Sequence, residues 1–142
     1  MIGYLDTSAV VPLLISEPSS PSCRRFWDDA DAVVTSRLTY VEASAALAQA
    51  RRLDRITNRT HRNALALLDQ LWEQFEVVEA DHVTVSRAAA LARQLALRGY
   101  DAVHCAAAES VQDAELVAAA GDQELLRAWA ELGVACYDTT RS

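Results

Sequence analysis

The stretch GYLDTS, at residues 3–8, runs from a short apolar segment into an acid and two hydroxyl residues. Short apolar segments bounded by capping residues are typical of strands buried on both faces of a parallel sheet. Asp, Ser and Thr often begin helices, because their side-chain oxygens accept hydrogen bonds from the free N–H groups of the first turn. The stretch therefore predicts a buried strand over 3–6. A helix over 9–15 should follow, with Pro12 placed in its first turn.

The same alternation of short apolar strand and helix continues along the chain. We expect further strands at 32–35, 75–78, 115–119 and 134–137. We expect further helices at 22–27, 39–52, 60–74, 83–97, 101–110 and 123–132. Strands that alternate with helices predict an α/β fold, in which a central, mostly parallel sheet is flanked by helices on both faces.

Length and composition narrow the class of protein. A chain of 142 residues suits one domain over 1–142, and 51% hydrophobic with 23% charged residues is ordinary for a globular protein. No apolar stretch approaches the roughly 20 residues that span a bilayer. Residues 1–6 lack the basic start of a secretory signal, so we expect a cytoplasmic protein. The net charge of −7 argues against a protein that coats nucleic acid broadly.

Four carboxylates lie at the ends or starts of the apolar segments: Asp6, Glu42, Asp101 and Asp122. Ligands of parallel α/β sheets bind beyond the carboxyl ends of the strands, and three of these acids fall near such ends. Asp101 lies at a helix start instead, so only tertiary packing brings it alongside. Acids that converge repel one another unless a cation neutralises them, so a cluster predicts a Mg²⁺ or Mn²⁺ site.

Helix capping explains each acid singly. Asp6, Asp101 and Asp122 fit N-cap positions, and Thr39 with Glu42 fits the capping-box pattern. Ser, Thr or Asn would cap equally well, yet an acid recurs at every position that can face one crevice. The four acids together therefore favour a metal site over capping alone.

Three motifs and a final acid follow one another along the chain: YLDTSAVV at 4–11, SRLTYVEA at 36–43 and GYDAVH at 99–104, then Asp122. They resemble the successive motifs of PIN-domain ribonucleases, and those of the VapC-type toxins of toxin-antitoxin pairs most of all. They occur in order and span nearly the whole chain. Each motif is weak alone, and the first three are specific in combination.

The resemblance implies a PIN fold whose acidic pocket holds Mg²⁺ or Mn²⁺ and cuts RNA phosphodiester bonds with a metal-activated water. Asp6 and Asp101 match the principal metal ligands, and Glu42 and Asp122 match the two supporting acids, so all four form the expected catalytic set. Thr7 and Ser8 match the polar pair that orients ligands or water by hydrogen bonds.

The resemblance also implies partners, a VapB-type antitoxin that blocks the pocket and a second copy of the chain in a homodimer. One departure from the family pattern concerns the last acid. The family often has a hydroxyl residue two positions before it, where this chain has Ala120. The departure puts the geometry around Asp122 in doubt more than the class of reaction.

Arginine is used unevenly along the chain. All 13 basic residues are arginine, and five of them lie within twelve positions: Arg51, Arg52, Arg55, Arg59 and Arg62. Arginine forks bind phosphate well, so this cluster is a candidate RNA contact. A solvated surface partnered by Asp54 explains the cluster equally well, and both interpretations stay open.

Histidine and tryptophan are expected to have no catalytic role. His104 lies one helical turn after Asp101 on the same face, but a packed or solvent-facing histidine is the favoured interpretation, so it is left out of the catalytic set. Trp27, Trp72 and Trp129 fall in helical patterns and are expected to be core or interface anchors.

Two functions from other classes stay open. One is a phosphatase that uses Asp6 as a covalent nucleophile, which is disfavoured because Ser8 stands where such enzymes have a second aspartate. The other is a PIN-like module that binds RNA or protein without cutting. Metal-dependent cleavage would separate the nuclease from the binding module, and a covalent phospho-aspartate would identify the phosphatase.

Overall fold

In the computed structural model, which describes residues 1–141, five parallel strands form one sheet in the order β3-β2-β1-β4-β5. The strands are β1 (Ile2–Leu5), β2 (Ala32–Ser36), β3 (Phe75–Val78), β4 (Leu116–Ala120) and β5 (Cys136–Asp138). Every pairing between neighbours in this order is parallel. The expected α/β fold with a parallel sheet is confirmed. Ser142, the last residue of the expected 1–142 domain, lies outside the described residues.

Helices fill the connections between the strands. They are α1 (Thr7–Leu14), α2 (Ser20–Asp29), α3 (Leu38–Arg52), α4 (Asn58–Trp72), α5 (His82–Leu95), α6 (Gly99–Ser110) and α7 (Gln123–Glu131). Within residues 1–141 none of them is long and apolar enough to cross a membrane. Each expected element is present, with bounds that differ by a few residues.

Two of these differences have a physical cause. The first helix begins at Thr7 because Asp6 caps it, so Pro12 is a residue of the helix interior and not of the first turn as expected. Proline lacks the N–H that the preceding turn would bind, and α1 ends two residues later at Leu14. The helix expected from Asp101 begins two residues earlier, at Gly99.

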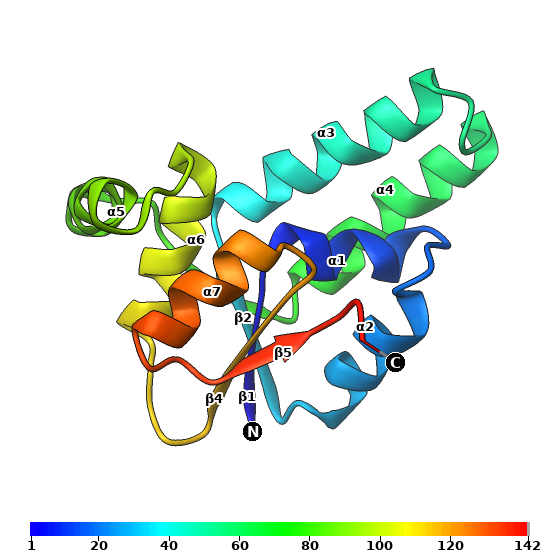
Figure 1. Ribbon diagram of the computed structural model, residues 1–142. Coiled ribbons are helices and arrows are strands. Elements are labelled where there is room, and N and C mark those ends of the chain that lie inside the picture. The colour runs from blue at the N-terminus through cyan, green and yellow to red at the C-terminus, as the bar shows by residue number, and fades with distance from the viewer. Residues whose placement is uncertain (142) are drawn as a thin grey trace.

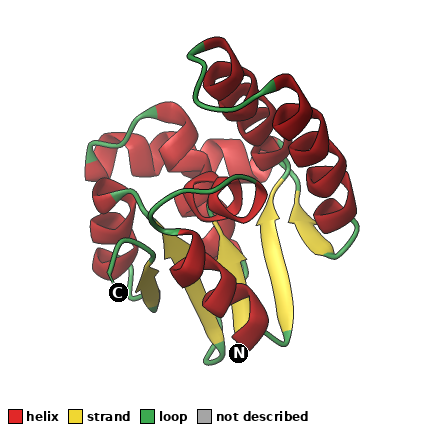
Figure 2. Cartoon of the chain, turned by 90° about the vertical axis from the view of Figure 1, so that its right-hand side faces the viewer, coloured by secondary structure: helices red, strands yellow, loops and turns green. Residues whose placement is uncertain are grey.

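The sheet is covered on both faces, with α1–α4 on one side and α5–α7 on the other (Figure 1, Figure 2). Neighbouring residues of one strand point to opposite faces, as the two-residue period of a strand requires. Tyr4 belongs to the core beneath α5–α7, and Leu5 belongs to the core beneath α1–α4. This double burial explains why the strands are continuously apolar.

The order of the strands creates a switch point between β1 and β4. The chain adds β2 and β3 on one side of β1, then crosses over and adds β4 and β5 on the other side. The connections beyond the carboxyl ends of β1 and β4 therefore diverge to opposite faces of the sheet. Such a divergence leaves a crevice, which is where ligands bind in open parallel sheets.

The three tryptophans pack as expected. Trp129 on α7 is fully buried and meets Tyr4 edge to face, with 5.9 Å between ring centroids. Trp27 and Trp72 are partly buried and both pack against Phe75 of β3. The prediction that these residues are core anchors is confirmed.

Gly3 leaves no room for a side chain, which gives a test of the packing between β1 and α2. A Cβ atom at this position would lie 2.8 Å from Cε2 of Phe26 and 3.3 Å from Cβ of Ala30. We expect Gly3→Ala to lower the free energy of unfolding by about 1–3 kcal/mol, the usual cost of overpacking a core. Urea unfolding measures this difference.

Gly99→Ala is the matched control, because no atom lies within 4 Å of the added Cβ and the position is helical. We expect it to retain or slightly raise the stability, since alanine favours helices over glycine by up to about 1 kcal/mol. Equal stabilities of Gly3→Ala and the wild type would contradict the packing described here.

Candidate active site

All four candidate acids line one open pocket of about 400 Å³ at the switch point: Asp6, Glu42, Asp101 and Asp122. Asp6 follows β1, Asp122 follows β4, and Glu42 comes from α3. Asp101 arrives from α6, on the opposite face of the sheet from α3. Tertiary packing thus supplies the fourth acid, which no strand end places in the crevice.

Asp6 and Asp122 each use one carboxylate oxygen to cap a helix. Oδ2 of Asp6 accepts hydrogen bonds from the Ser8 amide at 3.1 Å and the Ser8 hydroxyl at 2.6 Å. Oδ1 of Asp122 accepts from the amides of Glu124 and Leu125 at 2.9 and 3.2 Å. The other oxygen of Asp6 lies 3.3 Å from the His104 ring, and the other oxygen of Asp122 lies 3.6 Å from Arg98.

Capping does not explain Glu42 or Asp101. α3 begins at Leu38, and the Thr39 hydroxyl bonds to the Thr35 hydroxyl at 2.7 Å, so the capping box that was considered for Thr39 and Glu42 does not form. Glu42 instead accepts a hydrogen bond of 2.8 Å from the Thr7 hydroxyl. Asp101 lies inside the first turn of α6, where Arg98 is the N-cap residue.

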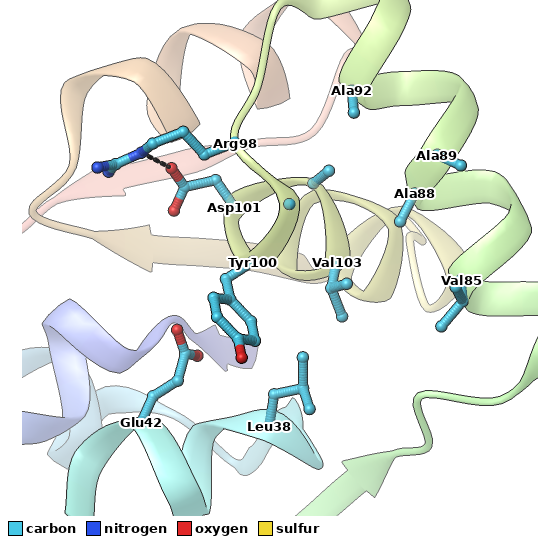
Figure 3. Close-up of a pocket in the computed structure, with 12 residues that line it drawn as sticks. Leu38, Glu42, Val85, Ala88, Ala89, Ala92, Arg98, Tyr100, Asp101 and Val103 are labelled. Carbon is cyan, nitrogen blue, oxygen red and sulfur yellow. Dashed lines mark hydrogen bonds and ion pairs between the residues drawn. The ribbon is translucent and has the colours of Figure 1, made fainter. Parts of the chain in front are cut away.

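Arg98 brings positive charge to the site, and no pattern in the sequence indicates this role. Its guanidinium lies 3.1 Å from Asp101 (Figure 3). It also lies 3.6 Å from Asp122, so it stands between two acids that would otherwise repel each other. Its side chain is 84% exposed, whereas the side chain of Asp101 is 18% exposed. A largely exposed guanidinium therefore lies between two carboxylates that are at most 25% exposed.

The acids have different electrostatic surroundings. Burial and the charge of Asp122 raise the pKa of Asp101 above its ordinary value, and the opposing effect of Arg98 does not cancel them. Burial also raises the pKa of Glu42, but the hydrogen bond and charge of His104 outweigh it, so the net shift is downward. Asp101 is therefore ionised at an energetic cost that Glu42 avoids.

His104 is packed, as expected, but it also touches the acids of the pocket. Its side chain is 1% exposed, and its Nε2 lies 2.6 Å from Glu42 and 3.3 Å from Asp6. Burial lowers the pKa of His104, while the charges of Asp6 and Glu42 raise it by more. The packed position expected for His104 is confirmed. Its spacing of one turn from Asp101 is the signal in the sequence for its contacts with the acids, and its place in the catalytic set stays untested.

Ser8 joins the first strand end to the fourth. Its hydroxyl donates to Asp6 and accepts a 2.8 Å hydrogen bond from the amide of Gly121, next to Asp122. A hydroxyl from α1 thus reaches the β4 end, close to where the family pattern often has a hydroxyl at position 120. The expectation that Thr7 and Ser8 support the acids agrees with their hydrogen bonds to Glu42 and Asp6.

Carboxylate oxygens are the ligands that Mg²⁺ and Mn²⁺ prefer, and the crowding that raises the pKa of Asp101 favours a cation. The chemistry of the donors therefore fits these ions. Among residues 1–141, however, no three His, Cys, Asp or Glu side chains are arranged so that they could hold a metal ion together. Arg98 stands between two of the four acids in this arrangement.

The arginine cluster lies at the turn between α3 and α4, at the outer end of the hairpin in Figure 1. Arg51 pairs with Asp54 at 3.1 Å, as the solvated-surface interpretation expects. Arg55 instead reaches Glu17 at 3.7 Å, and Glu17 lines the acidic pocket. One member of the cluster therefore lies at the edge of the candidate site.

An apolar groove of about 730 Å³ opens beside the acids, between α3, α5 and α6. Figure 3 shows Glu42 and Asp101 on one side of it and Val85 and Ala88 on the other. Tyr100 is 61% exposed, and its ring extends toward α3. The groove thus presents apolar surface that ends at two acids.

A parallel sheet between two layers of helices, with four acids at its switch point, is the architecture to be identified. Comparison with known protein families identifies it. A model of the PIN domain family matches residues 3–128, so the chain belongs to the PIN domain family. Within it, the chain is similar to the ribonucleases VapC45 and VapC49 of Mycobacterium tuberculosis. Each is 41% identical over 122 residues, which are 86% of this chain and 85% of the relative. The resemblance found in the sequence motifs is confirmed.

Solved structures show the same fold. FitAcB from Neisseria gonorrhoeae matches with a TM-score of 0.73 and 18% identity over 100% of both chains. VapBC-5 from Mycobacterium tuberculosis matches with a TM-score of 0.61 and 22% identity over 96% of this chain and 98% of that chain. The expected PIN fold is confirmed.

The raised pKa of Asp101 predicts that its charge destabilises the protein when no cation is bound. A carboxyl group whose pKa is raised on folding lowers stability as pH rises above its unfolded value, near 3.8. In EDTA at pH 7 we expect Asp101→Asn to melt at a higher temperature than the wild type. The gain should shrink as the pH falls toward 4. Differential scanning calorimetry measures both effects.

Glu76→Gln on β3 is the control, because this carboxylate is exposed and lies on an edge strand. We expect no comparable gain from it. A melting temperature of Asp101→Asn at or below that of the wild type in EDTA would show that the charge at this position is well compensated.

Proposed function

We propose that the protein is a Mg²⁺- or Mn²⁺-dependent endoribonuclease and the toxin of a VapBC-type toxin-antitoxin pair. The observation that carries the proposal is the pocket of four carboxylates at the switch point. It occurs in a PIN-domain chain that is 41% identical to two proteins named ribonucleases. Like-charged oxygens crowded in one pocket suit an enzyme that recruits a divalent cation.

The free oxygens of Asp6 and Asp101 would hold the cation, with Glu42 and Asp122 as supporting acids. A divalent cation bound there supplies positive charge for the phosphoryl transition state and promotes the ionisation of water. Thr7 holds one oxygen of Glu42, and Ser8 holds one oxygen of Asp6, so the remaining oxygens keep fixed directions. These hydrogen bonds orient the acids before substrate arrives.

Arg98 has a role in this proposal that follows from its exposure. If Asp101 and Asp122 held a divalent cation, the guanidinium of Arg98 would lose both partners and would be free to turn outward. A guanidinium fork matches the oxygens of a phosphodiester, so Arg98 is placed to bind the RNA backbone beside the pocket. The same residue thus balances the acids without substrate and contacts the phosphate with it.

No side-chain nucleophile is needed. The Ser8 hydroxyl is engaged by both Asp6 and Gly121, so it is not free to attack a phosphate. His104 lies beneath the acids with 1% exposure and does not reach the open side of the pocket. Water is the remaining nucleophile, which agrees with hydrolysis.

A VapB-type antitoxin is the proposed partner, and solved relatives described as toxin-antitoxin complexes support it. The apolar groove between α3, α5 and α6 leads to Glu42 and Asp101, so a segment with apolar side chains and a basic end would fit it and cover the acids. The homodimer implied by the family stays a prediction.

The proposed activity is tested by RNA cleavage with the purified chain, free of antitoxin, in Mg²⁺, Mn²⁺ or excess EDTA. We expect cleavage only with metal. Asp6→Asn and Asp101→Asn should each lower the rate by more than about 100-fold, because losing a ligand costs more than the 10–100-fold loss typical of its hydrogen-bond partners. Glu76→Gln should cut like the wild type.

Three results would contradict the nuclease. Folded wild type that leaves total cellular RNA intact in both metals would favour the PIN-like binding module. Cleavage that persists in EDTA and in both aspartate variants would point to a contaminating enzyme. A phosphorylated Asp6 after incubation with a phosphate ester would identify the phosphatase.

The arginine cluster gives a separate prediction about RNA binding. We expect the double variant Arg55→Gln/Arg59→Gln to bind a labelled RNA more weakly. The affinity of this variant should also depend less on salt concentration. Each lost phosphate contact should reduce the slope of log K against log salt by about 0.7. Fluorescence anisotropy in Mg²⁺, in an Asp6→Asn background that does not cut, measures the slope. Arg93→Gln on α5 is the control, and an unchanged slope in the double variant would leave the cluster as solvated surface.

A further inference from the structure

His104 joins the buried core to the acidic pocket through its two ring nitrogens. On the core side, Nδ1 lies 2.8 Å from the hydroxyl of Tyr4, which is fully buried. On the pocket side, Nε2 lies 2.6 Å from Oε1 of Glu42 and 3.3 Å from Oδ1 of Asp6. One ring therefore contacts two of the four acids, and they come from different elements of the fold.

Hydrogen-bond accounting fixes which nitrogen faces the acids as a donor. A buried hydroxyl needs a partner, and within residues 1–141 the Tyr4 hydroxyl has Nδ1 of His104 as its side-chain partner. In the neutral ring Tyr4 donates to Nδ1, so the ring proton lies on Nε2 and points at the carboxylates. In the charged ring both nitrogens carry protons, and Tyr4 accepts from Nδ1. In both forms a donor at Nε2 faces Glu42 and Asp6.

Aromatic packing holds this pair in place. The Tyr4 ring meets the His104 ring edge to face at 6.1 Å and meets Trp129 in the same way at 5.9 Å. All three residues are at most 1% exposed. Side chains in such packing keep one rotamer, so the direction of the Nε2–H bond is fixed by the core.

Glu42 needs such a fixed donor more than Asp6 does. Asp6 is already held by Ser8, whereas Glu42 has a longer side chain whose rotamers must be restricted. His104 and Thr7 both contact Oε1 of Glu42, at 2.6 and 2.8 Å. Oε2 of Glu42 is left without a hydrogen-bond partner among the described residues, on a side chain that lines the pocket.

We propose that His104 is a positioning residue that fixes Glu42, and through it the spacing between Glu42 and Asp6, for a divalent cation. The proposal rests on the function proposed above. It adds to that site a buried residue, which contacts the acids from the core side. His104 touches neither the cation nor the RNA, and it acts through the direction that it gives to two carboxylates.

Mn²⁺ affinity, measured by calorimetric titration of folded protein without RNA, tests the proposal independently of activity. His104→Asn keeps an amide near Nδ1 but loses the donor at Nε2, whereas His104→Gln places an amide donor near Nε2. We expect His104→Asn to weaken Mn²⁺ binding by about 10–100-fold and His104→Gln to retain most of it. Cleavage should fall in the same order, through the metal concentration needed for half-maximal rate.

His82→Asn is the control, because His82 is exposed at the start of α5. Melting temperatures of all variants show which of them fold. If His104 served packing alone, His104→Asn and His104→Gln would lose stability and yet bind Mn²⁺ as the wild type does, which would overturn the proposal.

The two proposals fail in different ways. Wild type that cuts RNA with metal while His104→Asn binds Mn²⁺ normally would overturn the role of His104 and leave the nuclease intact. Wild type that binds Mn²⁺ in a His104-dependent way without cutting RNA would overturn the nuclease alone. Wild type that binds no Mn²⁺ would overturn both.

Discussion

Repulsion among four carboxylates in one crevice is the constraint around which the site is arranged. The parallel sheet brings Asp6 and Asp122 to the same edge, and α3 and α6 add one acid each from opposite faces. Arg98 and His104 offset part of this charge, one from the solvent side and one from the core. Burial and the charge of Asp122 nevertheless raise the pKa of Asp101, so Arg98 does not fully stabilise its ionised form. This partly compensated acidic pocket suits the divalent cation that we propose.

Capping and catalysis are not competing explanations for the aspartates, because a carboxylate has two oxygens. Asp6 and Asp122 each give one oxygen to amides at the start of a helix. Those hydrogen bonds fix the carboxylate group, so its other oxygen keeps its direction toward the crevice. Ser or Asn would cap as well, but neither offers a second charged oxygen. Capping therefore explains one oxygen of each aspartate, and the second, charged oxygen that faces the crevice explains why the residue is an acid.

The architecture and the four acids could be predicted from the sequence because both depend on local patterns. Continuous apolar strands indicate burial on two faces, and the acids follow strands or begin helices. The contacts that complete the site are long-range: His104 meets Glu42 across 62 residues and Tyr4 across 100. The capping box considered for Thr39 failed for the same reason, since its hydroxyl bonds to Thr35 of β2. Arg98 bridges Asp101 and Asp122, and Asp122 caps a different helix, α7. A contact between two helices leaves no periodic pattern in the sequence from which it could be predicted.

Flexibility is distributed unevenly across the pocket, and the distribution follows from what lies behind each acid. Asp6 and Glu42 rest on a buried network that ends in Tyr4 and Trp129, so moving them requires moving the core. Asp101 and Asp122 are joined through Arg98, whose long side chain is 84% exposed and turns at little cost. The pocket therefore combines one pair of acids held by the core with one pair joined through an exposed side chain. In the function that we propose, Asp6 of the first pair and Asp101 of the second would hold the cation, so Arg98 would have to release Asp101.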